Sequence, residues 1–181
     1  MKVGILDTGG ANHASIFNAL ARVGADGFLI ETASQLSNAS CLILPGVGHA
    51  AAAMARIREK NLVEKIVGFP RPVLGICLGM QLYFENLEEG GVRGLEMLPG
   101  RVGILPILPG VRVPHMGWNQ VEQKTSSPLW RGIDKDSFFY FTHSYACPST
   151  AASIGLVKEP FLFCAALAFR NFFGTQFHPE K

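Results

Sequence analysis

Short apolar runs that stop at glycine or proline turns constrain the fold of this chain more than any other feature of its sequence. The first 76 residues contain KVGILD (2–7), GFLIE (27–31), SCLILPG (40–46) and RPVLGI (71–76). Between them, residues 12–23 and 49–67 carry apolar residues at helical spacing, the first behind a candidate cap at Asn12. Buried strands that alternate with helices are typical of a mostly parallel sheet covered by helices on both faces. We therefore predict an open α/β fold.

The second half of the chain has a different pattern. After residue 90, segments broken by Gly and Pro are followed by the aromatic-rich runs FFYFTHSY (138–145), FLFCAALAF (161–169) and FFGTQFH (172–178). No strong helical pattern lies between these runs. We predict that they form an antiparallel extension of the first sheet, within a single domain over residues 1–181.

The composition excludes several function classes. The net charge is only +2 and the basic residues are scattered, which argues against a nucleic-acid partner. The four cysteines form no CxxC pair, so the sequence predicts neither a disulfide framework nor a metal site. No apolar run approaches the ~18 residues that span a bilayer, and the first run is too short for a signal peptide. We expect a soluble, cytoplasmic protein without a membrane partner.

Cys77 stands between two glycines where the fourth apolar run meets a helical pattern. The segment GICLG (75–79) matches G-x-nucleophile-x-G, in which a strained strand-to-helix turn exposes the nucleophile. Ligands of open α/β sheets bind beyond the carboxyl ends of the strands, and Cys77 lies at such an end. A helix starting near Leu78 favours the reactive thiolate. The alternative is a small, inert, buried cysteine, and the flanking glycines favour the nucleophile.

A thiolate nucleophile needs a base and a group that orients the base. His178 lies in QFHPEK, where Pro179 favours an extended chain, and residues two apart in an extended chain project to the same side. Glu180 is therefore expected to hold the imidazole of His178, although a surface His-Pro-Glu turn remains open. His115 and His143 are further candidates to line a cleft.

The nucleophile also needs donors for an oxyanion. In turns of this kind one donor is the backbone N–H that follows the nucleophile, here that of Leu78. A second comes from a neighbouring strand-end loop, and LPGVGHA (44–50), with two glycines around Val47, is the candidate. A plain turn is equally compatible with this segment alone.

Three of these segments occur together, and in the same order, in a known family. PGVG, GICLGMQ and FHPEK resemble the class I (triad-type) glutamine amidotransferases. VPHMGWN (113–119) and FYFTHSY (139–145) further resemble the glutaminase subunits of imidazole glycerol phosphate synthases. The likeness extends from residue 2 to residue 181. It implies a flavodoxin-like sheet, and a domain that lacks the C-terminal helix of the family because the sequence ends at Lys181.

The resemblance also implies a mechanism. Cys77 would attack the side-chain amide carbon of glutamine, and the N–H groups of Val47 and Leu78 would stabilise the oxyanion. His178, oriented by Glu180, would protonate the leaving ammonia and then activate water against the glutamyl thioester, which gives glutamate. The residues that would contact glutamine are Gly46, Gln81, His143, Ser144 and Tyr145.

A partner follows from the same resemblance. The ammonia would be channelled to a (βα)8-barrel cyclase in a heterodimer, which makes imidazole glycerol phosphate and AICAR in histidine biosynthesis. No cofactor and no metal is implied. The residues that would face the partner are Asn12, Trp118, Asn119, Tyr140 and Lys181.

Other functions remain open at this point. A paralogous amidotransferase would feed ammonia to a synthase for a surface-polysaccharide sugar, anthranilate or guanylate. A non-catalytic glutamine-sensing module would keep the fold without the reaction. A cysteine protease is disfavoured because residues like CGSCW are missing around Cys77.

Overall fold

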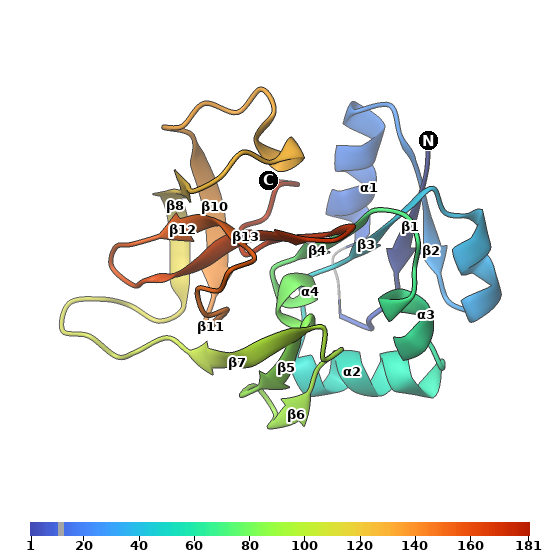
Figure 1. Ribbon diagram of the computed structural model, residues 1–181, viewed down its shortest axis with the longest axis horizontal. Coiled ribbons are helices and arrows are strands. Elements are labelled where there is room, and N and C mark those ends of the chain that lie inside the picture. The colour runs from blue at the N-terminus through green and yellow to red at the C-terminus, as the bar shows by residue number, and fades with distance from the viewer. Residues whose placement is uncertain (11–12) are drawn as a thin grey trace.

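A central sheet organises the computed structural model, which describes residues 1–10 and 13–181 (Figure 1). The strand order is β2-β1-β3-β4-β14-β13-β12-β9, and all pairs from β2 to β14 are parallel. The predicted mostly parallel sheet is confirmed, and each apolar run of the first 76 residues forms one of its strands. The parallel strands are β2 (Asp26–Ile30), β1 (Lys2–Leu6), β3 (Cys41–Leu44), β4 (Val73–Ile76) and β14 (Phe172–Thr175).

Helices cover both faces of the parallel strands, as Figure 1 shows. Successive side chains of a strand point to opposite faces, so neighbours in β1 enter different cores. Ile5 packs in the cluster that includes residues of α1 (His13–Arg22). Leu6 packs in the cluster that includes residues of α2 (Ala50–Glu59) and α3 (Val63–Val67). The continuous apolar runs are thus explained by burial on both sides.

The predicted helix over 49–67 is wrong in one respect, because the chain forms α2 and α3 in its place. The break falls at Asn61, whose φ is 54°. Asparagine tolerates this left-handed conformation better than most residues, and a left-handed residue ends a helix. The helical spacing of apolar residues continues across the break, so periodicity alone did not reveal it.

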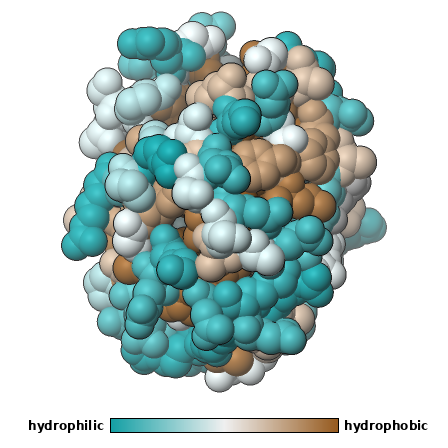
Figure 2. All heavy atoms as spheres, turned by 90° about the vertical axis from the view of Figure 1, so that its right-hand side faces the viewer, coloured by the Kyte–Doolittle hydropathy of each residue, from teal (hydrophilic) through white to brown (hydrophobic). Residues whose placement is uncertain are grey.

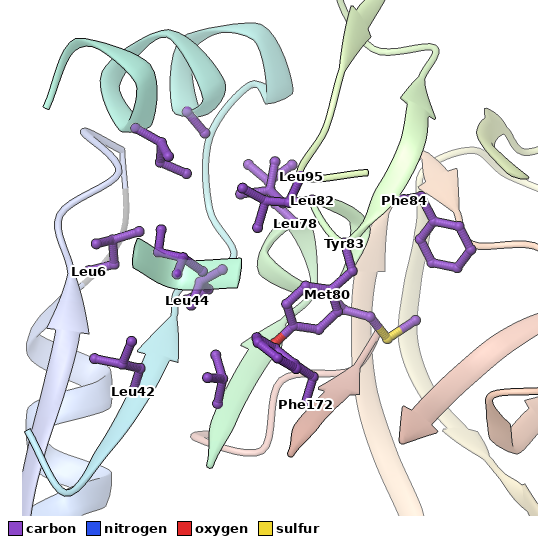
Figure 3. Packing of buried hydrophobic residues seen from close by; sticks show 14 of the residues in the cluster. Leu6, Leu42, Leu44, Leu78, Met80, Leu82, Tyr83, Phe84, Leu95 and Phe172 are labelled. Carbon is purple, nitrogen blue, oxygen red and sulfur yellow. The ribbon is translucent and has the colours of Figure 1, made fainter. Parts of the chain in front are cut away.

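The segment after Cys77 forms only one helical turn, α4 (Leu78–Gln81), before the chain enters β5 (Phe84–Leu87). Figure 3 shows its side chains in the larger core cluster, with Tyr83 close to Phe172. The Tyr83 hydroxyl donates to the carbonyl of Phe173 at 3.0 Å. Because the segment is buried on all sides, its apolar pattern has no periodicity that separates a helix from a strand.

The predicted antiparallel extension is confirmed in β13 (Phe163–Phe169), β12 (Ser153–Val157) and β9 (Glu122–Gln123). The run at 172–178, however, was expected in that extension, and its strand β14 pairs parallel with β4 instead. A strand pattern identifies a strand but not its neighbour, which is set by contacts distant in sequence.

The described residues also form two small sheets, mostly from the second half of the chain, that the sequence did not predict. One pairs β8 with β10, and the other has the order β11-β7-β5-β6. Short 3-10 helices, η1 and η2, lie elsewhere in the chain. The bounds of these elements are β6 (Val92–Arg93), β7 (Leu98–Ile104), β8 (His115–Gln120), β10 (Phe138–His143), β11 (Tyr145–Ala146), η1 (Ala33–Asn38) and η2 (Pro128–Trp130).

The helices that the structure describes are all too short or too polar to cross a bilayer. Figure 2 shows the end of the molecule at the right of Figure 1, where hydrophobic residues are interspersed among hydrophilic ones. The predicted cap Asn12 lies outside the described residues.

Candidate active site

The backbone at Cys77 forms a tight turn between β4 and α4. Cys77 has φ 49° and ψ −106°, a conformation that a residue with a side chain adopts only at a cost in free energy. A Cβ on Gly75 would overlap the backbone of Gly79, and a Cβ on Gly79 would overlap the carbonyl of Leu44. The two glycines therefore allow the close approach that the turn requires, as the sequence pattern predicts.

His178 lies near this turn because β14 pairs with β4. Thr175, the last residue of β14, is the register partner of Ile76, the last residue of β4. The residues that follow the two strands, His178 and Cys77 among them, therefore leave the sheet at the same edge. Nδ1 of His178 lies 2.9 Å from Oε1 of Glu180, and the two side chains are only 4% and 9% exposed. The contact forms within a turn, closed by the Lys181 N–H on the carbonyl of His178 at 3.3 Å, and not in the extended chain that we predicted.

The electrostatics of His178 favour a charged imidazole. Burial opposes its protonation, but interactions with the Cys77 sulfur and with Glu180 outweigh burial and raise the His178 pKa to about 9. Burial likewise opposes ionisation of Glu180, but the hydrogen bond to His178 lowers the net pKa of that carboxyl. Nε2 of His178 has no hydrogen-bond partner within the described residues. The imidazolium therefore has a free proton to offer a bound molecule.

A cavity of about 310 Å³ joins these groups, a size at the lower end for small-ligand sites. Glu180 is not among its lining residues and contacts His178 from behind. All other residues that the sequence assigned to catalysis, the oxyanion or glutamine line it: Gly46, Val47, Cys77, Leu78, Gln81, His143, Ser144, Tyr145 and His178.

The loop after β3 lies directly against the cysteine turn. A Cβ on Gly46 would overlap the carbonyl of Ile76 and contact Cβ of Cys77. Val47 follows and is half exposed at the cavity. Leu78 is the first residue of α4, so its N–H has no acceptor within that helix. The two predicted oxyanion donors thus come from neighbouring segments of one cavity.

The sequence and the fold both match known proteins. The family model described as "Glutamine amidotransferase class-I" matches residues 4–181. The "Imidazole glycerol phosphate synthase subunit HisH" of Xylella fastidiosa (strain 9a5c) is 44% identical over 180 residues, which are 99% of this chain and 90% of that protein. The protein of the same name from Haemophilus influenzae is 42% identical over 181 residues. The chain belongs to the HisH family of class I glutamine amidotransferases.

Solved structures agree with this family at the level of the fold. A crystal structure described as a glutamine amidotransferase superposes with a TM-score of 0.76 over 98% of this chain and 90% of its own, at 15% identity. A putative GMP synthase protein from Thermoplasma acidophilum superposes with a TM-score of 0.73 over 100% and 85%, at 18% identity. The open, mostly parallel amidotransferase sheet is thus confirmed.

Hydrogen bonds hold the residues that were predicted to contact the substrate glutamine. Nε2 of Gln81 donates to the carbonyl of Tyr145 at 2.8 Å. Nδ1 of His143 lies 2.9 Å from the same carbonyl. Burial is the main cause that lowers the His143 pKa to about 3, so this imidazole is neutral at pH 7. These contacts fix one wall of the cavity without a charge on it.

Gln176 is a site residue that the sequence analysis missed. It is fully buried, and its Nε2 donates to Sγ of Cys77 at 3.4 Å while its Oε1 accepts from Gln81 at 3.2 Å. The thiol in turn donates to the carbonyl of Thr142 at 3.9 Å. The position of Gln176, two residues before His178, was a signal that the residue lies on the cysteine side of the strand end.

We expect a Gln176→Met variant to turn over glutamine about tenfold more slowly, because the reactive thiolate form of Cys77 would lose a hydrogen bond that contributes about 1.5 kcal/mol. Methionine keeps most of the volume but cannot donate to the thiolate. Alkylation of Cys77 by iodoacetamide measures the loss without substrate. An alkylation rate equal to that of the wild type across pH 6–9 would contradict the assignment.

The residues expected to face a partner do not all share one surface. Trp118 and Tyr140 are register partners in the β8–β10 sheet, and their rings meet edge to face at 5.8 Å. Trp118 is 62% exposed. Asn119 instead lies on the inner face, where Nδ2 donates to the carbonyl of Glu159 at 3.0 Å. Lys181 is exposed, and Asn12 lies outside the part of the chain that the structure describes.

Proposed function

We propose that this chain is the glutaminase subunit of an imidazole glycerol phosphate synthase, which hydrolyses glutamine to glutamate and ammonia for histidine biosynthesis. The observation that carries the proposal is the single cavity that holds Cys77 and His178, with Glu180 behind the imidazole. The names of the HisH relatives support the pathway. Glutamine suits a cavity that offers hydrogen-bonding groups such as the Gln81 amide and the neutral His143 imidazole.

The first chemical step is thioester formation. Sγ of Cys77 attacks the side-chain carbonyl carbon of glutamine, and the oxygen takes up the negative charge. The N–H groups of Val47 and Leu78 stabilise this oxyanion. His178 gives its Nε2 proton to the amide nitrogen as the carbon–nitrogen bond breaks, so ammonia leaves and the acyl group stays on sulfur.

The second step is hydrolysis of the thioester. The imidazole of His178, now neutral, removes a proton from a water molecule that attacks the acyl carbon. The carbon–sulfur bond breaks, glutamate leaves, and His178 is again protonated beside the thiolate. Glu180 fixes the orientation of the ring and stabilises its charged form through the 2.9 Å contact to Nδ1.

The raised pKa of His178 predicts how the rate depends on pH. Glutamate release should fall as the pH rises through about 9, because the imidazolium then loses the proton that ammonia departure needs. The sign is the same for the unfolding free energy: the stability that the charged imidazole contributes is fully present below the ordinary histidine pKa of 6.5 and is lost as the pH rises from there through about 9. Steady-state rates between pH 7 and 10 test this. A rate that keeps rising to pH 10 in a folded protein would contradict it.

The outer face of the β8–β10 sheet is the surface that we propose for the cyclase partner, a (βα)8 barrel in a heterodimer. Met116, Trp118 and Phe138 are each more than half exposed there, at 63%, 62% and 58%. A cluster of exposed apolar side chains is typical of an interaction surface. Direct transfer of ammonia to the partner has a physical reason, since protonation in water would remove its nucleophilic lone pair.

Co-purification with the cyclase encoded in the same genome tests the proposal as a whole. The complex is expected to form imidazole glycerol phosphate with glutamine as the nitrogen source. Glutamate release without imidazole glycerol phosphate would indicate a paralogous amidotransferase that serves another synthase. Glutamine binding without glutamate release in either state would indicate a glutamine-sensing module.

A further inference from the structure

Two histidines face each other across the β8–β10 sheet, and one of them, His115, was expected to line a cleft but is not among the residues that line the cavity. His115 and His143 are register partners, and Nδ1 of His115 lies 3.1 Å from Nε2 of His143. Exposure alternates along β8, so His115 and Asn119 lie on the inner face while Trp118 lies on the outer one. The pair thus lies directly beneath the proposed partner surface and reaches the cavity through His143.

The hydrogen bond between His143 and the carbonyl of Tyr145 determines which ring nitrogens of the two histidines carry hydrogen. The carbonyl of Tyr145 can only accept, so Nδ1 of His143, 2.9 Å away, carries a hydrogen. A neutral imidazole carries one hydrogen, and burial keeps His143 neutral by lowering its pKa. Nε2 of His143 is therefore an acceptor, and Nδ1 of His115 is the donor that faces it.

The hydrogen bonds of Asn119, on the other side of His115, give the same assignment of hydrogens. Oδ1 of Asn119 accepts from the N–H of Gln120 at 2.8 Å, and its Nδ2 donates to the carbonyl of Glu159 at 3.0 Å, so the amide has one orientation. The same Nδ2 lies 3.4 Å from Nε2 of His115, which must accept. Nδ1 of His115 then carries the hydrogen. Every nitrogen of both rings has one defined role.

Loss of the hydrogen bond between the two histidines would cost free energy because aromatic rings surround the pair. The rings of Phe141 and Phe163 lie 5.1 Å and 5.7 Å from the ring of His115. His143 packs on Phe163 at 4.9 Å and is 6% exposed. These aromatic walls cannot replace a lost hydrogen-bond partner, and an unpaired nitrogen in apolar surroundings is strongly disfavoured.

We propose that His115 is a positioning residue for the glutamine pocket. Its Nδ1–H holds His143 in the tautomer that donates to the carbonyl of Tyr145, the same carbonyl that accepts from Gln81. His115 acts through His143 and lies outside the cavity lining. The inference rests on the proposed function, because glutamine is the ligand that the pocket would bind.

Two variants of His115 separate this role from simple packing. His115→Leu removes the donor to Nε2 of His143. His115→Asn keeps a donor, because its amide nitrogen is two covalent bonds from Cβ, as Nδ1 of histidine is. In the complex with the cyclase, the leucine variant is expected to raise the KM for glutamine about tenfold with kcat changed less than about threefold, because a buried acceptor loses its partner. The asparagine variant is expected to recover at least half of that loss on a logarithmic scale.

A matched control addresses damage to the core. Phe161 is 3% exposed and packs on the ring of His115 with centroids 6.5 Å apart, but it makes no hydrogen bond in this chain of side chains. A Phe161→Leu variant removes packing next to His115 and leaves the donors in place. Its KM for glutamine is expected to stay within about twofold of the wild type.

The ¹⁵N spectrum of histidine-labelled protein gives a readout that does not depend on activity. The wild type is expected to show His143 protonated at Nδ1 and accepting a hydrogen bond at Nε2, and the leucine variant to show a shifted Nε2 resonance because that acceptor has lost its donor. The inference is overturned by a wild-type His143 protonated at Nε2, by an unchanged KM in the leucine variant, or by an asparagine variant as impaired as the leucine one. A wild type that releases no glutamate would overturn the proposed function instead, and the spectrum would still decide the tautomer.

Discussion

A Cys77→Ser variant is expected to release glutamate at least ~10³-fold more slowly than the wild type, with its fold intact. A serine hydroxyl is hardly ionised near neutral pH, so the residue in the turn would need a base to become a nucleophile. The thiolate, and not a hydroxyl, is the nucleophile that the proposed mechanism uses. Glutamate release at saturating glutamine, with the cyclase present, measures the effect.

The control for this prediction is another cysteine. Cys41 is half buried at the start of β3 and does not line the cavity, so a Cys41→Ser variant should keep the rate within about twofold. Circular dichroism and co-purification with the cyclase check that both variants are folded. If the Cys77→Ser variant kept more than about a tenth of the rate, sulfur would not be the nucleophile.

The parallel half of the fold was predictable because its signals are local. β1, β3 and β4 are short apolar runs that end at turns, and each forms where the sequence predicts a strand. The turn at Cys77 was predictable for the same reason. Its glycines are adjacent to the cysteine in sequence, and the steric demand that they satisfy lies within a few residues.

The strand pairing in the second half was not predictable, because it depends on contacts between distant segments. β14 has the same kind of aromatic pattern as β13, yet it pairs parallel with β4, about 100 residues earlier in the chain. The approach of His178 to the cysteine turn is a consequence of that pairing. Sequence order and motif content indicated the residues, but only the sheet order explains why they meet.

Two polar contacts in the site were hidden for a related reason. The hydrogen bond from Gln176 to Cys77 joins residues 99 apart in sequence. The His115–His143 pair exists because the register of β8 and β10 places these residues opposite each other. A one-residue slip of that register would turn one ring to the outer face. The residue types in the two strands do not by themselves determine which residues pair with each other.

A Gly79→Ala variant is expected to lose about 3 kcal/mol or more of unfolding free energy and most of its glutamate release. The added Cβ would overlap the carbonyl of Leu44. Leu44 cannot move away easily, because it is the register partner of Gly75 in the β3–β4 pair. Alanine favours a helix over glycine by about 1 kcal/mol, which is too little to offset the overlap. Urea unfolding gives the stability, and the rate shows whether the turn at Cys77 is displaced.

A Gly103→Ala variant isolates this steric effect from the general cost of replacing a glycine. Gly103 lies in β7, and a Cβ there would meet only Oε2 of Glu88 at 3.3 Å, the end of a flexible side chain whose contacts to the N–H of Ile104 and to Arg101 lie at the surface. Its unfolding free energy should change by less than about 0.5 kcal/mol. If the two variants lost the same stability, backbone entropy and not the overlap with Leu44 would explain the glycine at position 79. Because Gly79 follows Cys77 by two residues, a displaced turn would also slow alkylation of the thiol, and Gly103→Ala would leave that rate unchanged.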